Sequence, residues 1–209
     1  MKKPYWLVAL LLAAELFLIL VFVPGKWTEQ VIVNESAMVE RTLGHNSVQW
    51  INERALRWYS STMVDSGVYQ GLHTLLIPSP EERARSRGME NLGSTIFPWL
   101  EDRLFSMMRV FYQVFARMAL LMVWAPYMLI LLIPAMYDGW LNWKIKRTNF
   151  DYASPVIHRY GVRGIVLMLQ ILLIAFFAPI ALNPIVIPFA MMIACVMIGL
   201  AMGNIQKRI

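Results

Sequence analysis

The stretch from Gly164 to Gly203 contains no charged residue, and it constrains the fold of this chain more than any other feature. An α-helix rises about 1.5 Å per residue, so about 20 apolar residues cross the roughly 30 Å hydrocarbon core of a bilayer. One helix over the whole stretch would exceed that thickness about twofold. Asn183-Pro184 is the natural turn within it. We therefore predict a hairpin of two transmembrane helices, 164–182 and 184–202.

Two further apolar segments are long enough to cross a bilayer. The first runs from Tyr5 to Val23, within a segment 1–23 that also holds the short N-terminus, and it ends without the small residues of a signal-peptide cleavage site, so we expect an uncleaved anchor. The second covers 113–136. Its helical pattern already begins at Pro98, which predicts one long helix from Pro98 to Met136. Proline is tolerated inside such a helix because neighbouring helices and water satisfy the freed carbonyl groups.

Basic residues determine the orientation of these spans. They gather before the first span, in the loop 137–163 and in the tail 204–209, whereas the turn at Asn183 has none. With four spans, these three basic segments lie on one side of the membrane, as the positive-inside rule requires. The sequence thus predicts an all-α integral membrane protein with about four transmembrane helices and both termini in the cytoplasm. Residues 24–112 then form a mostly helical external domain.

Composition and motifs argue against an enzyme. The formal net charge of +6 follows from topology, so we expect no direct nucleic-acid binding. The single cysteine, Cys195, excludes an intrachain disulfide, and the three histidines lie far apart in the sequence. The chain contains no phosphate-binding glycine loop and no catalytic-serine motif. We predict no catalytic residues, no metal site and no cofactor.

The external domain has few sequence signals of its own. We expect Ser47 to cap a helix, because apolar residues follow it at helical spacing. Asn34-Glu35-Ser36 matches a glycosylation sequon, a tripeptide that arises easily by chance. The long helix carries polar residues at steps of three and four, which places them on one face. These are Asp102, Ser106, Arg109, Gln113 and Arg117.

Two ionisable residues are expected inside predicted spans. Glu15 lies near the middle of the first span and Arg117 near the outer end of the second. An acid in the bilayer costs at least a few kcal/mol unless it is neutral or paired. A Glu15–Arg117 ion pair, a contact of Glu15 with a membrane helix of another protein, and a proton or ion path are all open interpretations. The long Arg117 side chain can also extend to the lipid headgroups.

The loop 137–163 is basic and aromatic. A positively charged topology anchor accounts for most of its lysines and arginines. A topology anchor of this kind does not explain the presence of Asp138-Gly139 or His158-Arg159. We therefore identify six candidate residues for contact with a partner in the cytoplasm: Asp138, Gly139, Lys144, Arg147, His158 and Arg159.

At this loop the chain resembles the DtrJ-like membrane proteins of conjugative plasmids and integrating conjugative elements. The shared architecture is one span, an external helical domain, a second span that runs into Asp-Gly, a basic segment and a closing hydrophobic hairpin. It covers nearly the whole length, although the external domain contains no motif of that family. The residues that carry the resemblance are Asp138-Gly139, Arg147, Ser154, His158-Arg159, Pro179 and Pro184.

The resemblance implies an inner-membrane component of a conjugative type IV secretion apparatus in a Gram-negative bacterium, with residues 24–112 in the periplasm. Members of the family are linked to the coupling protein, the hexameric ATPase that brings DNA and relaxase to the channel. The expected partners are membrane lipids and the membrane helices of this ATPase, with further copies of the chain as a second candidate. Two alternative functions remain. One is a small ion- or proton-coupled transporter or channel that uses Glu15, and the other is an envelope scaffold or surface-exclusion protein that acts through the periplasmic domain.

Overall fold

A computed structural model describes residues 5–77, 90–149 and 152–205 of the chain. Within these ranges it contains helices and connecting segments and no strand, which confirms the all-α class. The basic residues Lys2, Lys3, Lys207 and Arg208 lie outside the described ranges. The chain divides into two compact units. The first comprises residues 1–119 and 176–183, and the second comprises 120–175 and 184–209.

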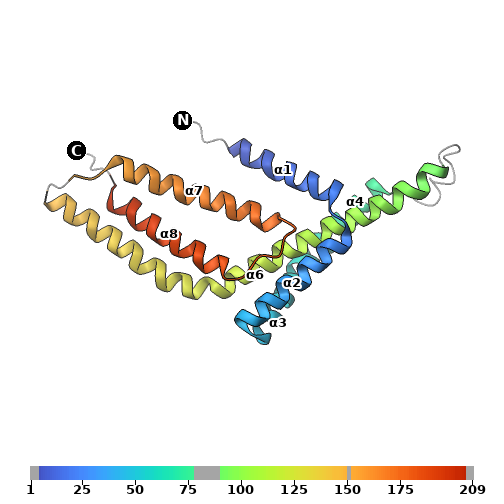
Figure 1. Ribbon diagram of the computed structural model, residues 1–209, viewed down its shortest axis with the longest axis horizontal. Coiled ribbons are helices and arrows are strands. Elements are labelled where there is room, and N and C mark those ends of the chain that lie inside the picture. Colours follow the sequence, from blue (N-terminus) through green and yellow to red (C-terminus); the bar gives the residue numbers. More distant parts are fainter. Residues whose placement is uncertain (1–4, 78–89, 150–151, 206–209) are drawn as a thin grey trace. The chain divides into compact units, whose positions relative to one another are not determined.

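The first unit is built from helices, and short connections join those between Tyr5 and Leu76 (Figure 1). Gly44 ends one helix and begins the next with a φ of +82°, a conformation that side chains with a Cβ rarely adopt. Helix α3 therefore begins at His45, so the prediction that Ser47 caps it is wrong. The Ser47 hydroxyl instead donates to the Leu43 carbonyl at 2.8 Å. The elements are α1 (Tyr5–Phe22), α2 (Gly25–Leu43), α3 (His45–Tyr59), the π-helical turn η1 (Ser60–Val64), α4 (Val68–Leu76) and the part of α6 (Glu90–Thr148) up to Ala119.

The first unit has its apolar core between α4 and α6. Ile77, Leu104 and Met108 are buried there, and partly buried aromatic rings surround them. The rings of Tyr59 and Tyr112 meet edge to face, with centroids 6.2 Å apart. Burial raises the pKa of Tyr59 above its usual value, and the nearby Tyr69 adds to this rise. This core covers one face of the first part of α6. The face that carries the polar stripe is therefore available to pack against another helix.

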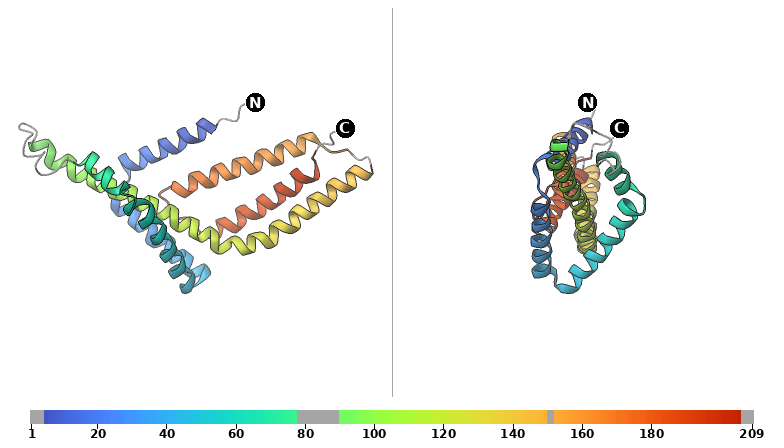
Figure 2. Two further views of the ribbon diagram at one scale, coloured as in Figure 1. Left: turned by 180° about the vertical axis from the view of Figure 1, so that it is seen from behind. Right: turned by 90° about the vertical axis from the view of Figure 1, so that its right-hand side faces the viewer.

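The second unit consists of three helices packed side by side. These are α6 from Leu120 onward, α7 (Pro155–Phe177) up to Ala175, and α8 (Val186–Gly203). Helix α8 lies between α6 and α7 in both ribbon views (Figures 1 and 2). A Cβ added at Gly139 would lie 2.8 Å from the Gly199 carbonyl oxygen. Such close approach between helix backbones requires small residues, as is common in membrane proteins.

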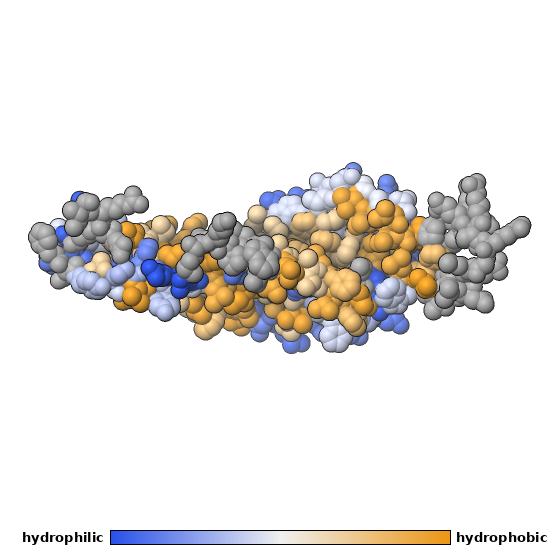
Figure 3. All heavy atoms as spheres, turned by 90° about the horizontal axis from the view of Figure 1, so that it is seen from above, coloured by the Kyte–Doolittle hydropathy of each residue, from blue (hydrophilic) through white to orange (hydrophobic). Residues whose placement is uncertain are grey.

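Three helices are long and apolar enough to cross a membrane: the stretch Ile96–Thr148 of α6, Pro155–Phe177 and Val186–Gly203. In α1 the apolar part among the described residues is the shorter segment Ala9–Ile19, so the first of the four predicted spans stays a prediction. Many large apolar side chains on these helices are exposed, for instance Ile130 at 68% and Val196 at 63%. In the space-filling view hydrophobic residues cover wide areas of the visible surface (Figure 3). Exposure of this kind suits a lipid environment.

The boundaries of α6 and α7 differ from those expected from the sequence. Helix α6 is continuous over the predicted range 98–136, but it extends to Thr148 and leaves a short connection before Pro155. Helix α7 then begins at Pro155, where proline suits the first helical turn, and the Ser154 hydroxyl accepts a 3.4 Å hydrogen bond from the Ile157 amide. Its last residue, Phe177, comes two residues before Pro179, since proline disfavours helical geometry in the residue before it.

Candidate functional site

The most extensive polar contact among the described residues of the first unit is centred on Arg117. This side chain is buried, with 1% of its surface exposed. Its Nε donates to Oε1 of Glu35 at 2.9 Å, and its Nη2 donates to Oε2 at 2.8 Å. Gln113 Nε2 donates to Oε2 at 2.7 Å. We call Arg117, Glu35 and Gln113 the Arg117 cluster. It joins α2 to α6 by a forked, charge-assisted contact.

The Arg117 cluster also holds the segment that follows α7. Arg117 Nη1 donates to the carbonyl oxygens of Phe176 at 2.8 Å and Ala178 at 3.0 Å, and Nη2 donates to that of Ile180. The indole Nε1 of Trp27 donates to the Pro179 carbonyl at 2.9 Å. The last carbonyls of a helix have no partner within the helix and interact favourably with a positive charge. Arg117 therefore caps the end of α7 and fixes segment 176–183 to α2 and α6.

These contacts bear on the two ionisable residues that the sequence singled out. Arg117 is buried and forms an ion pair with Glu35, a partner that the sequence did not indicate, and its extension to the lipid headgroups stays a prediction. Oε2 of Glu15 is buried and accepts no hydrogen bond from the described residues. A pairing of Glu15 with Arg117 or with another protein stays a prediction.

Glu35 is a functional candidate that the sequence reasoning missed. Five residues of α2 are buried at helical spacing: Gly25, Thr28, Val31, Glu35 and Val39. An acid within such a buried stripe requires a basic partner, and this was the signal that could have identified it. The predicted polar stripe of α6 is the surface that receives α2. There Gly25 donates its amide to Asp102 at 3.2 Å and accepts from Arg109 at 2.7 Å.

The second unit places the six predicted loop residues in two groups. Gly139 and His158 are engaged inside the unit. Gly139 is buried against α8, and His158 Nδ1 lies 2.7 Å from the Ala201 carbonyl oxygen. Since that carbonyl accepts, Nδ1 carries the proton in this contact. Both residues therefore hold the helices of this unit together.

The other four predicted residues are exposed: Asp138, Lys144, Arg147 and Arg159. The Lys144 ammonium lies 5.3 Å from the ring centroid of Trp140, and the Arg147 guanidinium lies 5.5 Å from that of Trp143. Cations stacked on tryptophan in this way are typical of helix ends at a membrane surface. These side chains remain accessible to a partner because their charged groups are on the surface.

Asn204 is a second residue that the sequence reasoning did not single out. It is 5% exposed and lies directly after α8. Its Oδ1 accepts from Lys146 Nζ at 2.9 Å and from the Ser154 amide at 3.3 Å, and its Nδ2 donates to the Leu200 carbonyl at 2.9 Å. One amide side chain thus connects the end of α6, the start of α7 and the end of α8.

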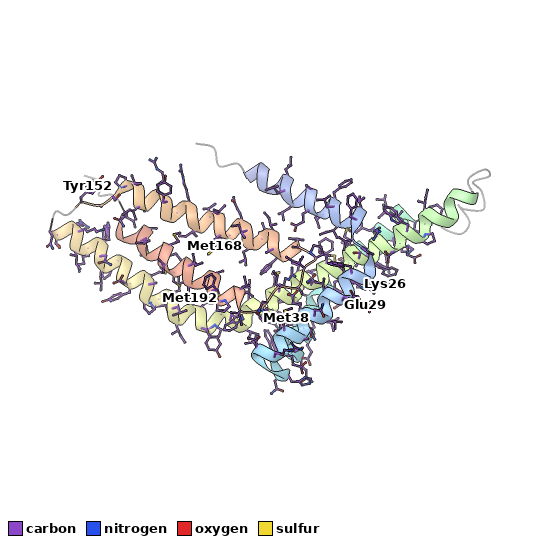
Figure 4. All side chains as sticks on the ribbon, in the orientation of Figure 1. Lys26, Glu29, Met38, Tyr152, Met168 and Met192 are labelled. Carbon is purple, nitrogen blue, oxygen red and sulfur yellow. The ribbon has the colours of Figure 1, made fainter. Side chains whose placement is uncertain are left out.

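A further ion pair links α2 to α6 at the surface of the first unit. Glu29 of α2, labelled in Figure 4, pairs with Arg109 at 3.2 Å, and both side chains are exposed. No group of three or more His, Cys, Asp or Glu among the described residues is placed to hold a metal ion. In each unit the helices pack together and are linked by polar contacts, those of the Arg117 cluster in the first unit and those of Asn204 in the second.

Comparison with known proteins agrees with the family resemblance of the sequence. A family model described as "IncC plasmid conjugative DNA transfer protein DtrJ-like" matches residues 26–208. This range includes the Arg117 cluster and all six loop residues, whereas Glu15 lies before it. No curated protein and no solved structure matches the chain. The match extends over most of the sequence, and the chain therefore belongs to the DtrJ-like family of conjugative DNA transfer proteins.

Proposed function

We propose that this protein is a non-enzymatic inner-membrane component of a conjugative type IV secretion apparatus and a membrane partner of the coupling ATPase. Family membership supports the role in DNA transfer, and the three apolar helices support a place in the membrane. The observation that carries the partner assignment is the exposure of four candidate residues, whose charged groups are therefore accessible to a partner. They are Asp138, Lys144, Arg147 and Arg159.

The proposed topology has four spans, with α1 as the first. Both termini and the connection between α6 and α7 are cytoplasmic, and residues 24–112 are periplasmic. The exposed cations of Lys144, Arg147 and Arg159 support this orientation through the positive-inside rule. Little of the chain then reaches the cytoplasm. An ATPase in the same membrane has to be contacted through helix surfaces and through these exposed cations.

Co-purification of the coupling ATPase from conjugating cells tests this proposal. We expect the ATPase to accompany the wild-type chain in mild detergent, and we expect Lys144→Glu with Arg147→Glu to reduce its yield severalfold. Arg57→Glu, a charge reversal at an exposed position of α3, is the matched control and should leave the yield unchanged. His158→Ala perturbs an internal contact and reports on folding of the unit. Failure of the ATPase to co-purify even with the wild-type chain would contradict the proposal.

One observation favours a second candidate function, a proton- or ion-coupled transporter. Oε2 of Glu15 is buried without a hydrogen-bond donor among the described residues, an arrangement that also occurs in proton relays. This function predicts that Glu15→Gln abolishes a proton or ion flux in liposomes and leaves co-purification intact. Absence of any flux through the reconstituted wild-type protein would eliminate it.

A further inference from the structure

A groove of about 440 Å³ lies between α6 and α8 of the second unit. Ala135 from α6 and Cys195 and Val196 from α8 line one end of it. Gly199 lines the middle. We call this the α6/α8 groove. Its volume lies in the range of sites that bind small molecules.

The other end of the groove is polar. Asn142 and Lys146 line it from α6, and Asn204 lines it from the end of α8. Because α6 and α8 run in the same direction, the higher residue numbers of both helices meet at this end. The groove therefore changes from apolar to polar along the helix axes, as the membrane does from its hydrocarbon core to its surface.

Lys146 and Asp138, which line the groove, carry opposite charges, and the excess of positive charge comes from residues beside the groove. Lys146 Nζ uses one hydrogen bond on Asn204 Oδ1, and an ammonium group has three to donate. The cations of Lys144 and Arg147 are exposed on the same last turns of α6. Asp138 also lines the groove, but one of its carboxylate oxygens accepts a hydrogen bond from Asn142 Nδ2 at 3.0 Å. An anionic group with several acceptor oxygens complements this arrangement.

We infer that the α6/α8 groove binds one anionic phospholipid, with its phosphate at Lys146 and an acyl chain along Cys195 and Val196. Basic pockets between transmembrane helices are suited to anionic headgroups. An apolar helix of another protein, or of a second copy, would cover the ammonium donors that Lys146 does not use on Asn204, which is costly in free energy. This inference requires that α6 and α8 lie in a bilayer, and it is independent of the coupling ATPase.

Native mass spectrometry of the full chain in detergent tests the headgroup site. The probes are phosphatidylglycerol and phosphatidylcholine with the same acyl chains. We expect wild type to retain phosphatidylglycerol selectively, and Lys146→Gln to lower its bound fraction by about tenfold through loss of a charge-assisted hydrogen bond. Lys26→Gln removes the same charge from an exposed position of α2 in the first unit, and it should change retention little. Equal losses in both variants would indicate general attraction to the surface and would overturn the site.

A second pair of variants tests the acyl-chain end. Val196→Trp places a large ring at the edge of the groove, and Ile193→Trp places the same ring at another exposed position of α8. We expect only Val196→Trp to abolish lipid retention. This pair keeps the inference testable if Lys146→Gln disturbs the packing of the helix ends. Equal retention of lipid by the two tryptophan variants would contradict the inference.

The single cysteine provides a direct probe of occupancy. Cys195 lines the groove, so a bound acyl chain should protect its thiol from maleimide alkylation. In nanodiscs with one chain each, we expect alkylation of the wild-type chain to be severalfold slower with phosphatidylglycerol than with phosphatidylcholine. Equal rates in the two lipids would overturn the inference. Protection that appears only with two chains per nanodisc, in either lipid, would also overturn it by assigning the groove to an interface between copies.

Discussion

Nη2 of Arg117 lies 2.8 Å from Oε2 of Glu35, and the two side chains are only 1% and 10% exposed. Removal of two charges from water is expensive, and their attraction repays it only when the remaining donors and acceptors are also satisfied. Here both carboxylate oxygens accept hydrogen bonds, and the other guanidinium donors bind backbone carbonyls at the end of α7 and just after it. The pair therefore specifies which faces of α2 and α6 meet.

Removal of one partner of this pair should be far more costly than removal of both. Glu35→Leu removes the carboxylate that accepts hydrogen bonds from Nε and Nη2 of the buried Arg117, and we expect it to lower the free energy of unfolding by about 3–5 kcal/mol. The double variant Glu35→Leu/Arg117→Leu should lose less. Equilibrium unfolding in mixed micelles measures both. Glu29→Gln, in the exposed pair with Arg109, is the control and should cost no more than about 1 kcal/mol. If Glu35→Leu were as stable as Glu29→Gln, this would contradict the structural role of the pair.

Arg117→Lys should loosen segment 176–183 although it keeps the positive charge. An ammonium group cannot reproduce the forked contact with Glu35 and the carbonyl contacts at the same time. We expect faster amide hydrogen exchange in residues 178–183, with exchange in α3 unchanged. Arg57→Lys, at an exposed position, should leave both regions as in wild type. Unchanged exchange in 178–183 of the Arg117→Lys variant would show that other contacts hold the segment.

Gly139→Ala should destabilise the second unit. The added methyl group would lie 2.8 Å from the Gly199 carbonyl oxygen and 2.9 Å from Met202 Cβ, so the two helices would have to separate. We expect a loss of about 1–3 kcal/mol, measured by thermal unfolding in detergent. Gly71→Ala is the matched control because, apart from its own helix and chain neighbours, no atom of the described residues lies within 4 Å of its added Cβ, and it should stabilise helix α4 by about 0.5–1 kcal/mol. Two variants with the same melting temperature would count against close packing at Gly139.

Alkaline pH should destabilise the first unit partly through Tyr59. Burial, aided by Tyr69, raises the pKa of the folded-state phenol above its usual value of about 10. The folded state then holds this proton more tightly than the unfolded state, so the stabilisation is complete below pH about 10 and is lost as the pH rises through the folded-state pKa. As the pH rises above about 10, the free energy of unfolding of the Tyr59→Phe variant should therefore fall less than that of wild type. Tyr152→Phe, at a 78% exposed position, should behave as wild type does.

Much of the fold could be predicted from the sequence because hydropathy and helical period are local properties. The uncharged stretch and its Asn183-Pro184 turn predicted the α7–α8 hairpin, and the stripe from Asp102 to Arg117 predicted a continuous α6 with one polar face. The start of α7 was less evident. Its signal was Ser154-Pro155, a capping serine before a proline, which hydropathy alone does not detect.

The sequence by itself thus determined the helical class, the apolar helices, the polar stripe of α6 and the family. The tertiary structure alone decided the partners across long separations. Arg117 is 82 residues from Glu35, and only the packing of α2 against α6 brings them together. In the same way, packing of α8 buries Gly139 and engages His158 in a hydrogen bond with the Ala201 carbonyl, while it leaves Lys144 and Arg147 exposed. Local sequence sets which face of a helix is polar or apolar, but the identity of the opposing face depends on how the whole chain packs.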